Sequence, residues 1–292
     1  MKNILQIIIR PFFYYFNVSS KVFNYIIRYI EVFSMPDNDA DIGPYLKKAF
    51  SAVLSARINR GINKHYALGA ILGALQAQCC GYKKITLIEF GVAKGDGLRS
   101  LMKVSEIIRQ KMGIDVRVVG FDNRTGLPEP KDFRDHPEIW SSSQFAMSQS
   151  YEILDLEVKK NDGDLIIGDI AQTLSTFNME DRVLAFASID VDYYSSTKPI
   201  TEWLKNVDSS FLLPASVLYF DDIISMWTYS KFAGESLAIQ EFNNESMSRK
   251  IELKYPSVKL FALHDFENVY RTGESSPLVK LVLFAHDLDR FY

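Results

Sequence analysis

Cysteine is almost absent from this 292-residue chain, which contains only Cys79 and Cys80. Two adjacent cysteines make a strain-free disulfide difficult, and their spacing is not that of metal ligands. The sequence also lacks an apolar run of the roughly 18 uncharged residues that span a bilayer, and no signal-type cleavage site follows its apolar start. We therefore expect a cytoplasmic protein.

A strong charge imbalance is absent as well, because 33 basic and 36 acidic residues leave a formal net charge of −3. No block of Lys and Arg is interleaved with aromatic residues, as a nucleic-acid groove requires. We therefore expect no nucleic-acid partner. The 47% of hydrophobic residues is enough for the core of one large α/β domain or two small domains.

The first 34 residues are unusually apolar. If residues 21–33 are helical, Lys21, Asn24, Arg28 and Glu31 form one narrow polar stripe, and the rest of the helix surface is apolar. Such a surface must be covered. Three interpretations stay open: packing within the chain or against a second subunit of a homo-oligomer, contact with the inner face of a membrane, or a different local structure.

The remaining chain predicts a helical region followed by a sheet. Residues 45–80 predict two cap helices with a break near Gly61, so residues 1–80 are expected to form a helical N-terminal region. From residue 85, the runs "ITLIEF", "VRVVGF", "DLIIGD", "VLAFASID" and "SVLYFDD" alternate with helical stretches, which indicates a parallel sheet. The runs "VKLFALH" and "VKLVLFAHDL" predict a closing hairpin. Residues 81–292 therefore predict a Rossmann-like α/β domain with a seven-stranded, mostly parallel sheet and helices on both faces.

The stretch "IEFGVAKGDG" is the first candidate site. Glu89 and Gly91 end the first run, and Gly95 lies where the next helix begins, which is the geometry of a ligand-binding turn. The glycine spacing differs from the dinucleotide fingerprint, and Glu89 would repel a pyrophosphate but attract a cation. This favours S-adenosylmethionine as the ligand of the turn. Two alternatives stay open: an NAD(P)-dependent oxidoreductase, and an ordinary tight turn whose glycines have only a structural role.

Two further acids follow later strand ends. Asp122, in "GFDNRTGLPE", is placed to accept hydrogen bonds from both ribose hydroxyls of such a cofactor, and Asp169, in "LIIGDI", to accept one from the adenine amino group. Taken singly, each is typical of a solvated turn aspartate. Three acids at three successive strand ends favour the cofactor interpretation.

A second candidate site lies in "SIDVDYYSST" and "LYFDDI", which supply Asp190, Asp192, Asp221 and Asp222. Adjacent strands are about 4.8 Å apart, so one carboxylate from each strand end can converge on a cation. An all-oxygen set suits Mg²⁺ or Mn²⁺. Asp190 and Asp192 share a strand face, and Asp192 is expected to support the site without binding the ion. The alternative is a pair of solvated strand-end aspartates.

Together these four motifs resemble the macrocin O-methyltransferase family of metal-dependent sugar O-methyltransferases, over residues 85–245. The resemblance implies a class I methyltransferase fold, S-adenosylmethionine as donor, and a sugar or glycoside acceptor. It also implies a divalent cation held by Asp190, Asp221 and Asp222, with Asp190 as the candidate catalytic base. The sequence departs from the family at "DNRTGLP", at Val191 and at "LPAS", which leaves the acceptor undetermined.

A third hypothesis comes from the apolar segment 1–34. It is a non-catalytic, membrane-peripheral or assembly subunit in glycan synthesis that keeps a methyltransferase-like fold. The intact set of strand-end carboxylates favours a catalytic protein over this alternative.

Overall fold

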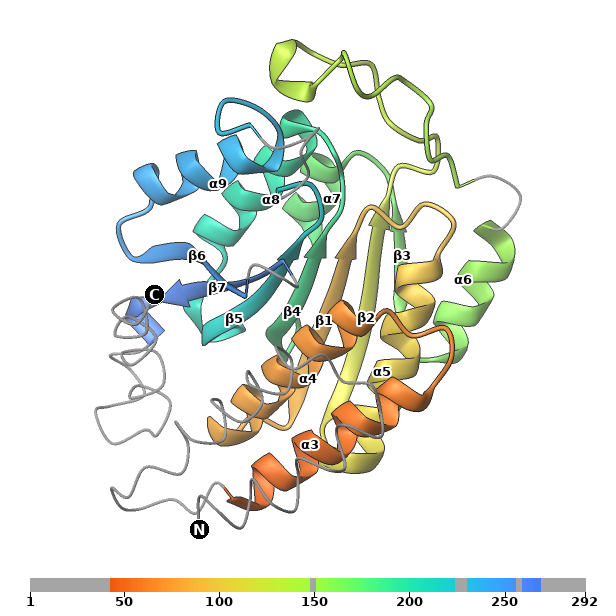
Figure 1. Ribbon diagram of the computed structural model, residues 1–292, viewed down its shortest axis with the longest axis vertical. Helices are drawn as coiled ribbons and strands as arrows, with labels where there is room; N and C mark the ends of the chain where they lie inside the picture. Colours follow the sequence, from red (N-terminus) through yellow and green to blue (C-terminus); the bar gives the residue numbers. More distant parts are fainter. Residues whose placement is uncertain (1–42, 148–150, 224–229, 256–258, 269–292) are drawn as a thin grey trace, which may run out of the picture.

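The computed structural model describes residues 43–147, 151–223, 230–255 and 259–268. One seven-stranded sheet forms the centre of the molecule, in the order β3-β2-β1-β4-β5-β7-β6 (Figure 1). The strands are β1 (Lys84–Phe90), β2 (Asp115–Asp122), β3 (Asp164–Ile167), β4 (Val183–Ile189), β5 (Leu212–Phe220), β6 (Arg249–Tyr255) and β7 (Leu260–Asp265). Strands β1 to β5 run parallel to one another, and β7 runs antiparallel to both of its neighbours, β5 and β6. The mostly parallel sheet predicted from the sequence is therefore confirmed.

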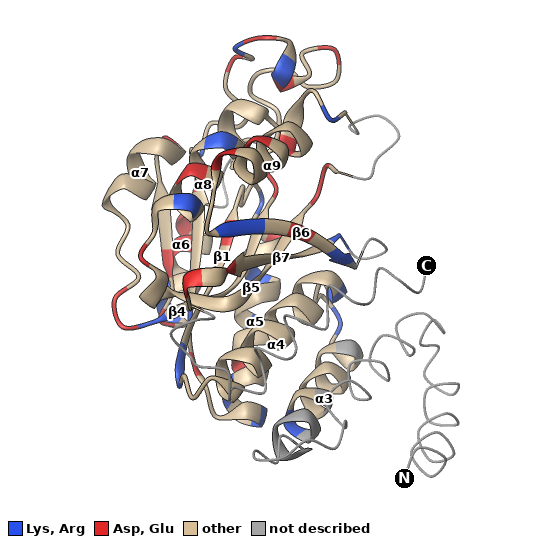
Figure 2. Cartoon of the chain, turned by 90° about the vertical axis from the view of Figure 1, so that its left-hand side faces the viewer, with Lys and Arg blue, Asp and Glu red and all other residues tan. Residues whose placement is uncertain are grey.

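Helices cover both faces of this sheet, as predicted. Those described are α3 (Gly43–Ile58), α4 (Lys64–Cys79), α5 (Asp96–Met112), α6 (Tyr151–Lys160), α7 (Ile170–Thr176), α8 (Tyr194–Asn206) and α9 (Gly234–Glu245), with short 3₁₀ turns η1 (Phe133–Asp135) and η2 (Ser209–Phe211). Buried side chains of α3, α4, α5 and α6 form one apolar core, and those of α7, α8 and α9 form the other. Figure 2 shows α4 and α5 on the opposite side of the sheet from α8 and α9.

The two helices predicted between residues 45 and 80 are present as α3 and α4. Helix α4 packs directly on the sheet, because a Cβ atom at Gly73 would lie 2.1 Å from the carbonyl oxygen of Ala185 in β4. Only glycine permits so close a crossing of helix and strand. Helix α4 is thus one layer of the same core, while the division of the chain into regions at residue 80 stays a prediction.

The antiparallel pair differs from the predicted hairpin. The strand predicted at "VKLFALH" is β7, but its hairpin partner is the preceding β6, "RKIELKY", which the sequence analysis did not identify as a strand. Strand β6 lies at the edge of the sheet, where alternating charged residues are common and hide the apolar pattern. The run at 279–288, expected to be a strand, lies outside the described residues.

The apolar segment 1–34 also lies outside the described residues, so its contact with a second subunit or a membrane stays a prediction. Among the helices of the described part of the chain, none combines the length and the apolar character needed to cross a bilayer.

Candidate functional site

A cavity of about 540 Å³ opens at the carboxyl ends of the parallel strands. Its walls come from the ends of the five parallel strands and from residues 123–147, here called the crossing loop, which rises above the sheet (Figure 1). Six aspartates line it: Asp122, Asp169, Asp190, Asp192, Asp221 and Asp222. Within the described part of the chain, no Lys, Arg or His is among the lining residues. The lining of the cavity is therefore acidic.

The glycine turn after β1 forms part of the cavity wall. Gly91 has φ +86°, and a Cβ atom there would lie 1.8 Å from the carbonyl oxygen of Asp190, so this turn requires glycine. Gly95 has φ +87°, is the N-cap of α5 and packs against Leu154 of α6 without lining the cavity. The turn thus brings the ends of β1 and β4 together and presents the start of α5.

Asp122 and Asp169 both line the cavity at the ends of β2 and β3, where the sequence placed them. Asp122 Oδ2 accepts hydrogen bonds from the backbone N–H groups of Val92 and Ala93, both at 2.9 Å. Asp169 accepts from the N–H groups of residues 171 and 172 and is the N-cap of α7. Asp122 therefore ties the glycine turn to β2, and Asp169 orders the next turn; their contacts with a cofactor stay predictions.

Glu89 does not line the cavity. It is 2% exposed, and one of its carboxylate oxygens lies 1.8 Å from where a Cβ atom at Gly97 of α5 would be. Burial, reinforced by the nearby Asp190, raises the pKa of Glu89 well above its usual range, while a hydrogen bond from Tyr66 opposes this increase. Its Oε2 has no hydrogen-bond partner among the described residues. Glu89 thus lies behind the glycine turn, facing α4 and α5.

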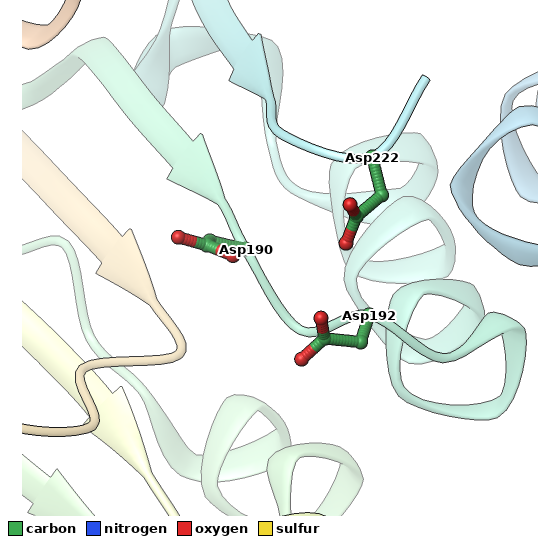
Figure 3. A group of neighbouring side chains, drawn as sticks. All are labelled: Asp190, Asp192 and Asp222. Atoms are coloured by element: carbon green, nitrogen blue, oxygen red, sulfur yellow. The ribbon is translucent and has the colours of Figure 1, made fainter. Parts of the chain in front are cut away.

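Three carboxylates converge at the ends of β4 and β5. Asp190, Asp192 and Asp222 place one oxygen each within 4.8 Å of the others, as Figure 3 shows. Burial, together with the charges of Asp221 and Asp222, raises the pKa of Asp190 to about 7. Burial and the charges of Asp222 and Asp190 raise the pKa of Asp192, whose carboxyl shares a hydrogen bond with Asp222. Burial is the largest cause of both shifts, and the nearby Lys259 ammonium offsets the increase at Asp190 only in part.

Asp221 lines the cavity but lies outside this group of three. Its carboxylate accepts hydrogen bonds from the Lys259 ammonium, at 2.9 Å, and from the Tyr219 hydroxyl. The predicted ligand set was Asp190, Asp221 and Asp222, whereas the structure groups Asp190 and Asp222 with Asp192. Asp192 reaches the cluster because its φ of +60° turns the chain sharply after β4.

The crossing loop contributes two buried groups that the sequence analysis missed. Asp135, which is 1% exposed, accepts a hydrogen bond of 2.7 Å from the N–H of Ser195 in the first turn of α8. The ring of His136 lies 3.3 Å from where a Cβ atom at Gly234 would be. The loop is therefore fixed on the side of the cavity that carries the three carboxylates. No local pattern marks these residues, because both contacts join distant parts of the chain.

Glu235 is a third missed residue. It lies in the first turn of α9, is 1% exposed, and its Oε2 accepts a 3.0 Å hydrogen bond from the backbone N–H of Asp222. Burial and the charge of Asp222 raise the pKa of Glu235 well above its usual range. The sequence showed only the helical spacing of "GESLAIQEF", which is typical of a helix with one buried face.

No family model and no curated protein sequence matches this chain. Among solved structures, the crystal structure of CalS11, described as a calicheamicin methyltransferase, is similar at a TM-score of 0.50 and 20% sequence identity, covering 85% of this chain and 94% of that one. A second structure, the apo form of CalS11 described as a TDP-rhamnose 3'-O-methyltransferase, gives 0.43 and 18% over 79% and 96% of the two chains. The O-methyltransferase NovP gives 0.45 and 17% over 65% and 77%.

At these identities the similarity to CalS11 establishes the fold and not the activity. The chain has the Rossmann-like class I methyltransferase fold, and this part of the sequence-based prediction is confirmed. Membership in the macrocin O-methyltransferase family stays a prediction.

Proposed function

We propose that this chain is an S-adenosylmethionine-dependent O-methyltransferase that methylates a hydroxyl group of a sugar or glycoside with the help of Mg²⁺ or Mn²⁺. The observation that carries the proposal is the cavity with six aspartates and, in the described part of the chain, no basic lining residue. Such a lining attracts the sulfonium and ammonium groups of the donor and a divalent cation. It repels a pyrophosphate, which disfavours the NAD(P)-dependent alternative.

The donor fits the side of the cavity formed by β1, β2 and β3. In this proposal Asp122 accepts hydrogen bonds from the ribose hydroxyls and Asp169 accepts one from the adenine amino group. Gly91 lets the backbone approach the donor closely, and Gly95 opens the N-terminus of α5. Glu89 lies buried behind this turn, and a cationic methionine end bound nearby would favour the ionised form of its carboxyl group, whose pKa burial raises.

The metal fits the other side of the cavity. Asp190, Asp192 and Asp222 offer the oxygen ligands that Mg²⁺ and Mn²⁺ take, and Oδ2 of Asp222 is buried without a partner among the described residues. We assign the ion to Asp190 and Asp222. Asp221, implied by the family resemblance, or Asp192, favoured by the observed grouping, supplies the third carboxylate.

The chemistry follows from this arrangement. A bound divalent cation supplies Lewis acidity, which lowers the pKa of an acceptor hydroxyl. Asp190 takes the hydroxyl proton, and the oxygen forms a bond to the methyl carbon of the donor. The bond between that carbon and the sulfonium sulfur breaks, and the sulfur keeps the electron pair as the neutral thioether S-adenosylhomocysteine. The cavity walls hold the two reactants in line.

Donor binding and methyl transfer test this proposal directly. Calorimetry should show binding of S-adenosylmethionine and S-adenosylhomocysteine and none of NADH. With donor carrying a radioactive methyl group, label should pass to members of a panel of nucleotide sugars, glycosides and aromatic diols in the presence of Mg²⁺, and EDTA should stop the transfer. Tight NADH binding without donor binding would support the oxidoreductase instead, and transfer only to the aromatic diols would contradict the sugar acceptor.

The raised pKa values predict how stability depends on pH. The folded, metal-free protein holds a proton on Asp190 up to about pH 7, whereas an unfolded chain releases it near pH 3.9. The folded state therefore binds more protons than the unfolded state between these pH values, and the free energy of unfolding falls as the pH rises through this window. Asp192 acts in the same direction.

We thus expect the metal-free protein to melt at a lower temperature at about pH 8 than at about pH 6. Mn²⁺ should raise the melting temperature more at the higher pH, where the ion does not compete with protons. Thermal unfolding at both pH values, with and without Mn²⁺, measures this, and Asp190→Asn should weaken the pH dependence. Equal stabilisation by Mn²⁺ at both pH values would contradict the prediction.

A further inference from the structure

Glu235 is a fully buried carboxylate that points from α9 toward the loop after β5. Its Oε2 accepts the backbone N–H of Asp222 at 3.0 Å, and its Oε1 has no hydrogen-bond partner among the described residues. Its oxygens are not part of the group of three that lies within 4.8 Å, so Glu235 is next to that group and does not belong to it.

A hydrogen bond to a backbone N–H does not by itself require a carboxylate. A neutral amide or hydroxyl accepts the same bond and is less costly to bury than a charged group, above all beside three other carboxylates. The N-terminus of α9 favours an acidic residue in its first turn, but the hydrogen bond of Glu235 goes to the loop after β5 and not to an N–H group of α9 itself. What joins α9 to Asp222 is therefore the acceptor oxygen of Glu235, and this role does not depend on the charge of the side chain.

The hydrogen bond between Glu235 and the backbone N–H of Asp222 lies at the point where the chain leaves β5. The loop leaves β5 after Phe220, and Asp221 is fixed by Lys259 on one side of the strand end. The N–H of Asp222 is fixed by Glu235 on the other side. The direction of the Asp222 side chain into the cavity therefore depends on a backbone held by α9, a helix that begins 12 residues later in the chain.

We propose that Glu235 is a positioning residue for the metal site: by accepting the backbone N–H of Asp222, it orients the Asp222 carboxylate toward the divalent cation. This inference rests on the proposed function, because it assumes that Asp222 is a metal ligand. Residues that orient metal ligands typically change metal affinity by about 10- to 100-fold when they are mutated.

The test is the affinity for Mn²⁺, measured by electron paramagnetic resonance of the free ion and by calorimetry, in the full-length protein. Glu235→Ala removes the acceptor and should weaken Mn²⁺ binding by about 10- to 100-fold. Glu235→Gln keeps an acceptor oxygen of the same reach and should stay within about threefold of the unmodified protein. Glu245→Ala, on the same helix but in surface ion pairs with Lys198 and Lys205, is the matched control and should leave the affinity unchanged.

Should Glu235→Ala fail to fold, Glu235→Asp takes its place, because it keeps the charge but withdraws the carboxylate by one methylene group. It should bind Mn²⁺ about tenfold more weakly, and more weakly than Glu235→Gln. Mn²⁺ affinity unchanged in Glu235→Ala, or equal losses in Glu235→Gln and the shortened variant, would overturn the inference. Failure of the unmodified protein to bind Mn²⁺ would instead contradict the proposed metal site itself, so the two failures are distinguishable.

Discussion

Replacing Asp222 with asparagine is expected to abolish metal-assisted methyl transfer while leaving the fold intact. The substitution keeps the shape of the side chain but removes one of three carboxylates within 4.8 Å of one another. It also makes neutral the Asp222 oxygen that is buried without a partner in the described part of the chain. Lewis-acid assistance is worth several kcal/mol. We therefore expect kcat/KM to fall by about a thousandfold, at 1.36 kcal/mol per factor of ten.

Two comparison variants make this result specific. Asp190→Asn should lose as much activity as Asp222→Asn. Asp181→Asn, at an exposed site paired with Lys84, should change nothing. The measurements are kcat/KM with saturating Mg²⁺, Mn²⁺ affinity, and thermal unfolding of each variant. Near-normal activity in Asp222→Asn, both with Mg²⁺ and after chelation, would contradict the metal mechanism.

Mn²⁺ affinity also tests whether Asp192 or Asp221 supplies the third carboxylate of the metal site. Asp221 is already engaged by Lys259 and by the Tyr219 hydroxyl, whereas Asp192 faces Asp190 and Asp222. We therefore expect Asp192→Asn to weaken Mn²⁺ binding more than Asp221→Asn does. The reverse order would restore the ligand set implied by the family resemblance.

The sequence was sufficient to predict the strand ends at which the site lies. Runs such as "VLAFASID" are apolar throughout because β4 is buried on both faces, and the first polar residue after each run marks the end of the strand. The ends of parallel strands meet at one edge of the sheet, so Asp122, Asp169, Asp190 and Asp222 line one cavity. This step needs only local patterns and one general rule of topology.

Side-chain directions beyond the strand ends were not predictable in the same way. Past the last ladder hydrogen bond, the alternation of faces no longer holds, and local backbone angles decide where a side chain points. The positive φ of Asp192 and the contact between Lys259 and Asp221 are of this kind. Glu235 and Asp135 are hidden for another reason: their partners Asp222 and Ser195 lie 13 and 60 residues away.

The second large effect is expected at the donor side, where replacing Asp122 with alanine should weaken S-adenosylmethionine binding by about two orders of magnitude. Asp122 Oδ2 accepts the N–H groups of Val92 and Ala93 in the glycine turn, and Oδ1 accepts the N–H of Arg124 at 2.6 Å. Hydrogen bonds to a charged group contribute about 1.5–3 kcal/mol each. Alanine removes both acceptor oxygens and with them all three hydrogen bonds, so the turn after β1 and the start of the crossing loop lose the group that joins them.

The donor affinity of Asp122→Asn should lie between those of the unmodified protein and Asp122→Ala. The single carbonyl oxygen of asparagine can still accept hydrogen bonds on one side, whereas its NH₂ group cannot accept any. Asp115→Ala is the matched control: it is at the other end of the same strand β2, in a surface ion pair with Arg182, and should leave donor affinity unchanged. Calorimetry with S-adenosylmethionine, checked by thermal unfolding, measures both. If Asp115→Ala weakened binding as much as Asp122→Ala, the loss would reflect a general weakening of β2. If Asp122→Ala bound the donor normally, donor binding would not depend on Asp122, and the proposed contact between this carboxylate and the ribose hydroxyls would be wrong.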